Sequence, residues 1–327
     1  MDKPLRRRIL TAWKDACGPG VRLPGGFRFS GEGDALTMAF RTAEGLGLGD
    51  APCNMQEDAA AFEGWALALY VHCLHGAGTV RLEGPEGLLT DAEALYTEYP
   101  HYSRFLYRAR RFSQVCGRWF RLSGGLRARA ERFGGFLERG VFTNNLPSGP
   151  AGVKGTLESA IESRFAEAGS PLAARLGCGA LYRQLPVGLF RGSVAAKNRI
   201  FTGGTSAIDL WGLSGDTLTV LELKAENKMV GAVTELFFYA NYVYDLFVKP
   251  GGGFRPNPGH GARGYDALRT ASEAGTLKRV RGCLLLDQES CHPLVTAALL
   301  KELDRGPVTY GCIRYRADAS AETISLG

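Results

Sequence analysis

The chain has little that would place it in a membrane or export it. No apolar run approaches the ~20 residues that a membrane-spanning helix needs. The first residues, from Met1 to Arg8, are basic and lack the apolar core and small-residue cleavage site of a signal peptide. These absences predict a cytoplasmic protein without a membrane partner.

The chain lacks cysteine pairs of the kind that hold zinc or iron–sulfur clusters. Eight cysteines are scattered along the 327 residues, and none forms a Cys-x-x-Cys pair. Reduced thiols in a cytosolic protein are the simpler expectation. The segment His72-Cys73-x-His75 ends an apolar, helix-like stretch, and we interpret it as a packed helix end in preference to a metal site.

Lysine is absent, and acid scarce, in one stretch of the first half. Between residues 101 and 132 there are nine arginines and one acid. The whole chain carries a formal net charge of +6, which suits a polyanionic partner without proving one. In the helix predicted there, Arg104, Arg108 and Arg111 share one face and could contact phosphates. The alternative is a solvated basic helix face.

The length allows roughly two domains of about 150 residues each. A segment rich in turn residues, 146–152, is the predicted boundary between an N-terminal domain, 1–147, and a C-terminal domain, 148–327. The first domain is predicted to be α+β, basic in its second half and of unknown role. Its clearest elements are a hairpin of strands 27–30 and 35–41 and helices over 57–74 and 102–116.

The second domain alternates helices and strands. Its hydrophobic periodicity predicts a helix, a strand region, a hairpin, a buried helix, and a further strand and helix. This α-β-β-β-α-β order is typical of an α/β protein in which helices cover one sheet. In that order, the predicted elements lie at residues 156–168, 180–190, 207–224, 231–248, 282–287 and 293–303.

Two acidic residues are set to face each other across the predicted hairpin. The tetrapeptide 214–217 is typical of a two-residue type II′ turn, because its second residue is glycine. Counting outward from that turn places Asp209 opposite Glu222, with Lys224 on the same face as Glu222. Directly opposed carboxylates repel each other. A bound divalent cation would offset this repulsion, and the two carboxylates would then form a metal site.

These residues resemble the PD-(D/E)XK nuclease superfamily, also called restriction-endonuclease-like. The resemblance covers roughly residues 153–290 and rests first on Ile208-Asp209, followed on the next strand by Glu222-Leu-Lys224. A preceding helix carries the acids Glu158 and Glu162. Two further features are Arg183-Gln184, similar to the NucS branch, and Glu235-Leu-Phe-Phe-Tyr239-Ala, which resembles the RecB-type Gln-Leu-x-x-Tyr-Ala with glutamate in place of glutamine.

The resemblance implies a fold and an activity. The fold is an αβββαβ core with a mixed sheet flanked by helices. The activity is hydrolysis of phosphodiester bonds, in DNA first of all, with bound Mg²⁺ or Mn²⁺. By this resemblance Asp209, Glu222 and the Leu223 carbonyl hold the metal. Lys224 would orient or deprotonate the attacking water, or stabilise the charge that develops on the phosphate.

The roles of three helical glutamates stay open at the level of sequence. Glu158 and Glu162 are four residues apart and share one helix face. Either one of them approaches the metal, with Glu162 preferred, or both belong to a charged outer face. Glu235 lies in an apolar helix and needs a partner. That partner could be Lys224, or a structural group at the helix end.

Cations in the segments that flank the hairpin are better placed for nucleic acid than the N-terminal arginines. These cations are Lys197, Arg199, Lys228, Arg255 and Arg263.

The rivals to a DNA nuclease are a nuclease acting on RNA and an inactive nucleic-acid-binding or partner-binding protein on the same scaffold. Strand preference, cleavage from ends or within a strand, and homo-oligomer formation are left open.

Overall fold

The protein is of the mixed α/β class, which confirms the predicted class at that level. The computed structural model describes residues 3–41, 55, 57, 59–84, 93–152, 155–201, 206–226, 229–249, 253–288, 291–318 and 324–327. Within these ranges no helix combines the length and apolar character needed to span a membrane.

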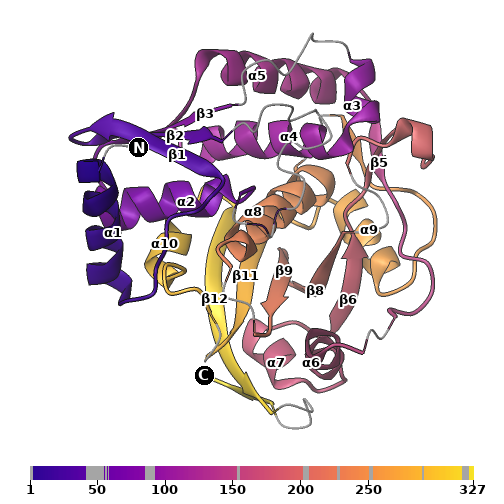
Figure 1. The fold of residues 1–327 in the computed structure, drawn as a ribbon. Coiled ribbons are helices and arrows are strands. Elements are labelled where there is room, and N and C mark those ends of the chain that lie inside the picture. Colours follow the sequence, from indigo (N-terminus) through magenta and orange to yellow (C-terminus); the bar gives the residue numbers. More distant parts are fainter. Residues whose placement is uncertain are drawn as a thin grey trace. The chain divides into compact units, whose positions relative to one another are not determined.

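Figure 1 shows the helices and strands coloured along the chain. Contacts divide the chain into two compact units. The predicted division after residue 147 is linear, whereas the two units are interleaved along the chain. The first unit consists of Met1–Phe136, Lys228–Glu235 and His292–Asp304, and the second of Leu137–Asn227, Leu236–Cys291 and Arg305–Gly327.

The first unit is built on a four-stranded sheet of order β1-β2-β3-β4. The first two strands form the predicted antiparallel hairpin, and β2, β3 and β4 run parallel. The strands are β1 Phe27–Glu32, β2 Ala35–Phe40, β3 Thr79–Glu83 and β4 Phe120–Leu122. The helices are α1 Lys3–Cys17, α2 Phe62–Ala68 with the π-helical turn η1 Leu69–Cys73, α3 Ala94–Glu98, α4 Pro100–Val115, α5 Gly124–Arg139 and α10 Ala297–Lys301.

Aromatic side chains make much of the first unit's core. The Trp13 ring of α1 stacks on Trp65 of α2, with centroids 5.5 Å apart. Phe62 meets Phe105 and Phe112 of α4 edge to face, at 5.8 Å in both cases. Such geometry adds about 0.5–1.5 kcal/mol per pair beyond area burial. Aromatic contacts therefore fix α1, α2 and α4 to one another.

The second unit holds a six-stranded sheet of order β13-β12-β11-β9-β8-β6. Strands β6, β8 and β9 form an antiparallel meander, and β9, β11 and β12 run parallel. The strands are β6 Leu181–Pro186, β8 Ala207–Ser214, β9 Thr217–Lys224, β11 Arg279–Asp287, β12 Val308–Ala317 and β13 Ile324–Leu326. A smaller sheet contains β5 Phe142–Asn144, β7 Leu189–Arg191 and β10 Phe254–Arg255, and η2 is a 3-10 turn at Ala196–Asn198.

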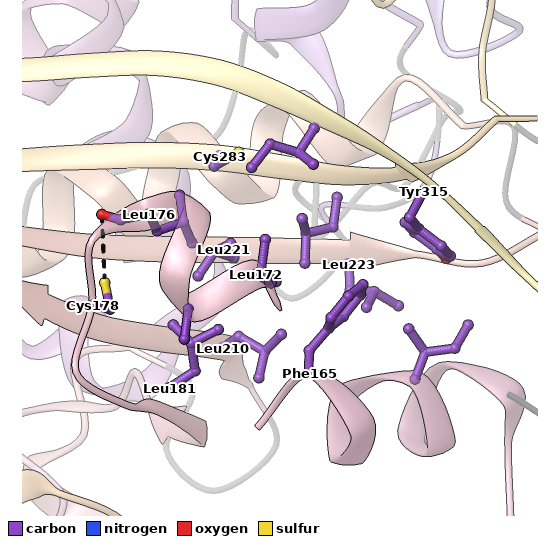
Figure 2. Close-up of a cluster of buried hydrophobic side chains, with 14 residues drawn as sticks. Phe165, Leu172, Leu176, Cys178, Leu181, Leu210, Leu221, Leu223, Cys283 and Tyr315 are labelled. Carbon is purple, nitrogen blue, oxygen red and sulfur yellow. Dashed lines mark hydrogen bonds between the residues drawn. The ribbon is translucent and has the colours of Figure 1, made fainter. Parts of the chain in front are cut away.

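Helices cover both faces of the larger sheet. Leu221 and Leu223 of β9 pack with α6 and α7 in one apolar cluster (Figure 2). On the opposite face, Gly282 lies against Ala240 of α8, and the Asn241 side chain donates to the Tyr310 hydroxyl at 2.9 Å. The helices are α6 Leu157–Phe165, α7 Pro171–Leu176, α8 Gly231–Val243 with the π-helical turn η3 Tyr244–Val248, and α9 Tyr265–Glu273. Because side chains alternate along a strand, Glu222 and Lys224 belong to the α8 face.

Candidate active site

The hairpin turn forms as predicted and sets the register of the two acids. Gly215 has φ +57°, and Asp216 stays outside the positive-φ region, as a type II′ turn requires. Ser214 pairs with Thr217, and the ladder runs outward to Leu210↔Leu221. The next positions in that register are Asp209 and Glu222. The observed pairing ends one position before them, so the direct opposition of Asp209 and Glu222 stays a prediction.

Asp209 lies where the strands lose their regular pairing. Among the described residues of β8, Asp209 is bridged neither to β6 nor to β9, although Ile208 and Leu210 both pair with β6. Its Oδ2 atom accepts a hydrogen bond from the Leu223 amide at 2.8 Å. This hydrogen bond to the backbone of β9 holds the Asp209 carboxylate beside the strand that carries Glu222.

Glu222 and Lys224 form a buried ion pair on β9. The Lys224 Nζ atom donates to Glu222 Oε1 at 2.6 Å, and the side chains are only 4% and 3% exposed. The Tyr315 hydroxyl donates to the Lys224 carbonyl at 3.0 Å and fixes the backbone there. Burial raises the pKa of Tyr315, so it remains a donor at neutral pH. The two residues therefore share a face as predicted, and their side chains form an ion pair that is buried in the protein.

The two glutamates of α6 take different partners. Thr156 caps the helix by accepting from the Ser159 amide at 3.3 Å, which starts α6 next to Glu158. Glu158 Oε1 accepts from the Ala225 amide at 3.1 Å, immediately after Lys224. Its carboxylate therefore reaches the end of β9. Of the two candidates for a third acid, Glu158 is the one with a contact to that strand end.

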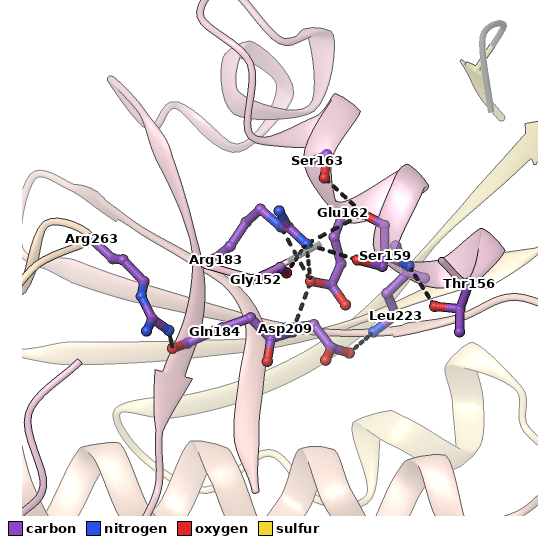
Figure 3. A network of polar contacts seen from close by, with 10 residues as sticks. All are labelled: Gly152, Thr156, Ser159, Glu162, Ser163, Arg183, Gln184, Asp209, Leu223 and Arg263. Atoms are coloured by element: carbon purple, nitrogen blue, oxygen red, sulfur yellow. Dashed lines mark hydrogen bonds and ion pairs between the residues drawn. The ribbon is translucent and has the colours of Figure 1, made fainter. Parts of the chain in front are cut away.

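Glu162 is held by β6. Its Oε2 accepts from the Gln184 side chain at 2.7 Å and from Arg183 Nη2 at 3.2 Å (Figure 3). The glutamate is 6% exposed. A guanidinium beside a buried carboxylate satisfies its charge. Glu162, preferred from the sequence as a metal ligand, is thus engaged in a structural ion pair.

An unusual backbone conformation accompanies these contacts. Gln184 sits inside strand β6 with φ +56°, in the left-handed region that a residue with a side chain rarely adopts. Arg263 Nη1 donates to the Gln184 carbonyl at 2.6 Å, and the same guanidinium bonds the carbonyls of Ser148 and Gly149. Burial, and then the nearby Arg183 charge, lower the pKa of Arg263. Arg263, predicted to contact nucleic acid, instead fixes three backbone carbonyls.

The prediction that one face of α4 contacts phosphates is wrong for Arg104 and Arg108. Arg108 is fully buried and pairs with Glu63 through two hydrogen bonds of 2.8 and 2.7 Å. Arg104 is 3% exposed and contacts His101, and Arg111 is half-buried. Two of the three arginines are therefore buried, and only Arg111 keeps part of its side chain in solvent.

The remaining predicted residues are placed as follows. Lys197 and Arg255 are exposed and Arg199 is half-buried, whereas Lys228 lies outside the described residues. Glu235 is 5% exposed on α8 and belongs to the first unit. Its suggested role in positioning Lys224 stays a prediction. The sequence singles out Arg183 only through the resemblance, and the contacts of Arg263 with backbone carbonyls have no signal in the sequence.

The donor set suits a hard cation. Within the described residues, no group of three or more His, Cys, Asp or Glu side chains is gathered to hold a metal ion. Magnesium, however, uses only one or two carboxylates and keeps several waters. A carboxylate has about four lone-pair sites, so the hydrogen bond to Asp209 does not exclude coordination. Asp209 is half-buried, whereas Glu222 is 2% exposed.

Comparisons with protein-family models, curated proteins and solved structures gave no significant match to this chain.

Proposed function

We propose that the protein is a metal-dependent nuclease that hydrolyses phosphodiester bonds, with DNA as the first candidate substrate. The observation that carries this proposal is the arrangement at the open end of the β8–β9 hairpin. There Asp209 accepts from the Leu223 amide of β9, Glu222 pairs with Lys224, and Glu158 reaches the amide that follows the lysine. An acid–acid–lysine set at a point where strands separate suits phosphoryl chemistry better than it suits a sheet.

The topology of the second unit supports the proposal. Helix α6 precedes the meander β6-β8-β9, and α8 connects β9 to its parallel neighbour β11. This αβββαβ order is the one expected of a restriction-endonuclease-like core. The small sheet of β5, β7 and β10 and the strands β12 and β13 would then be additions to that core.

In this proposal Asp209 and the Leu223 carbonyl, with Glu222 or Glu158, hold Mg²⁺ or Mn²⁺. A bound ion of this type lowers the pKa of its water and neutralises negative charge on the phosphate. Asp209 is oriented for its role by the Leu223 amide at 2.8 Å. Lys224 places an ammonium group on the same face as Glu222, where it can orient water or stabilise charge on phosphate oxygens.

Nucleic acid would be drawn to the second unit by its exposed cations. Lys197 of η2 and Arg255 of β10 are both exposed. Phosphate contacts of this type make binding strongly salt-dependent and carry no base sequence information. The proposal therefore concerns cleavage chemistry and leaves sequence preference open.

The test is a cleavage assay on linear, circular and single-stranded DNA and on RNA, each with Mg²⁺, Mn²⁺ or EDTA. We expect metal-dependent cleavage that falls by at least about 100-fold in Asp209→Asn, as for loss of a group acting directly in the reaction. The matched control is Asp216→Asn, which changes an exposed acid in the same hairpin, paired with Arg279 at 2.9 Å. Equal rates for the wild type and Asp209→Asn would overturn the assignment.

One observation favours a second candidate, a nucleic-acid-binding or partner-binding protein that has lost catalysis. The Glu222–Lys224 pair is almost completely buried, as a structural ion pair would be. Calorimetric titration with Mg²⁺ and Mn²⁺ separates the two candidates. Binding that disappears in Asp209→Asn supports the nuclease, whereas salt-sensitive DNA binding without metal binding or cleavage supports the inactive scaffold.

A further inference from the structure

A cavity of about 850 Å³ opens in the first unit between α1 and the π-helical turn η1. Ligand pockets for small molecules commonly enclose about 300–1,000 Å³. None of the residues that line this cavity belongs to the β8–β9 hairpin. It is therefore a separate feature from the proposed nuclease site, and it needs its own explanation.

The packing of α1 leaves a basic face directed to the cavity. Leu5, Ile9 and Trp13 fall one helical turn apart and are buried. The Trp13 indole donates to the Ala68 carbonyl at 3.2 Å, which fixes the apolar side of the helix. The neighbouring positions Lys3 and Arg7 are exposed and line the cavity. The helix that carries them is thus anchored on its other side.

The opposite wall comes from a distorted helix. Residues 69–73 form a π-helical turn, and three consecutive residues of it, Val71, His72 and Cys73, line the cavity. His75 follows with φ +51° and lines the cavity as well. Turns of this type occur frequently at functional sites. One ring nitrogen of His72 lies 3.3 Å from the Leu294 carbonyl, which limits the orientation of the imidazole.

The charge inside the cavity is strongly one-sided. Among the described residues that line it there is one acid, Asp15. Arg8 also donates to the Gly33 carbonyl, and this is one of five N–H donors of its guanidinium. The cations of the lining are Lys3, Arg7 and Arg8, and they lie beside the imidazoles of His72 and His75. Burial lowers the pKa of His72, which favours its neutral form.

We infer that this cavity binds a small phosphate ester of nucleotide size. Guanidinium groups match phosphate geometry through paired hydrogen bonds, and a lysine adds a mobile point charge. Ala12, Ala16 and Val71 provide apolar surface for the part of the ligand that carries no charge. The volume admits one such molecule and is too small for a length of duplex. The inference does not depend on the nuclease proposal.

The experiment is calorimetric titration of the full chain with ATP in EDTA, so that no metal joins the ligand to carboxylates. Adenosine serves as the probe that lacks phosphate. We expect ATP to bind and adenosine not to bind. Lys3→Ala/Arg7→Ala, which removes two cations from the lining, should weaken ATP binding by at least about tenfold. Asp15→Asn should tighten it, because repulsion between the acid and the phosphates is lost.

The matched control is Arg6→Ala/Lys14→Ala. It removes the same charge from exposed positions of α1 outside the cavity lining, and should change ATP affinity by less than about twofold. Equal losses in the two double variants, or adenosine binding as tightly as ATP, would overturn the inference. Absence of ATP binding in both the wild type and Asp15→Asn would overturn the inference as well. Asp209→Asn should bind ATP normally, which separates this test from that of nuclease activity.

Discussion

Asp209 lies between two residues of β8 that pair with β6, and the β6 residue between their partners is the strained Gln184. A left-handed residue in mid-strand costs about 1–2 kcal/mol, and here the contacts of Gln184 with Glu162 and Arg263 hold it in place. Strain of this type collects at functional sites. The same group of contacts also decides which glutamate of α6 is available for chemistry.

The two glutamates of α6 should respond differently to the same substitution. Glu158→Gln keeps an acceptor for the Ala225 amide but removes the charge, so we expect cleavage to fall at least about tenfold with little change in stability. Glu162→Gln leaves Arg183 buried without its counter-charge, and should lower the free energy of unfolding by about 2–3 kcal/mol. Urea unfolding and the cleavage assay measure the two effects. A stable Glu162→Gln protein without activity would reverse the assignment.

For single residues, the sequence predicts positions that a local turn fixes. It does not predict contacts with partners that are distant along the chain. The pairing of β8 with β9, from Ser214↔Thr217 to Leu210↔Leu221, could be counted from the Gly215 turn because strand register is local. The carbonyl clamp of Arg263 joins residues more than a hundred positions apart, as its bond to Ser148 shows. No periodicity contains that information, and the same holds for the burial of Arg108.

Elements with clear periodicity were predicted, though often with different ends. The helix predicted over 57–74 begins at Phe62 and continues into a π-helical turn, and the helix predicted over 231–248 likewise ends in one. Helix α5 was missed, since four glycines lower its helix propensity. One of them, Gly134, lies against the Arg110 guanidinium, so a Cβ there would displace that side chain.

The hairpin that carries the acids depends on its glycine. A Cβ on Gly215 would meet nothing within 4 Å, but φ is +57° there. Gly215→Ala should therefore lower the free energy of unfolding by about 1–2 kcal/mol through backbone strain alone. Gly311→Ala, in β12 with equal space and no positive φ, should be neutral or slightly stabilising. Urea unfolding compares the two, and equal effects would contradict the strain argument.

At the scale of the whole molecule, the first unit is assembled from distant parts of the chain. Glu63 of α2 accepts from Arg108 of α4 and from the Thr234 hydroxyl at 3.0 Å. All three residues are completely buried. A buried network of this kind is costly to break on one side because it leaves an uncompensated charge. Thr234, late in the chain, is thereby tied to the N-terminal part.

Removal of one partner of this network should strongly lower the free energy of unfolding. We expect Arg108→Met to lower the free energy of unfolding by about 3–5 kcal/mol, and Glu63→Met/Arg108→Met to recover much of that loss, since no buried charge remains. Arg111→Met, a half-buried arginine of the same helix with a 3.4 Å contact to Gln114, should cost less than about 1 kcal/mol. Chemical denaturation measures all three. A double variant no more stable than Arg108→Met would contradict the charge argument.

The continuity of α8 has a consequence for how the protein can be dissected. Its first residues, up to Glu235, belong to one unit, and those from Leu236 onward belong to the other. No single cleavage of the polypeptide can release either unit intact. A ribosome that has completed Phe136 has made only part of the first unit, because Thr234 and the segment His292–Asp304 are still to come. Maturation of the N-terminal part during synthesis therefore waits for most of the C-terminal part to be translated.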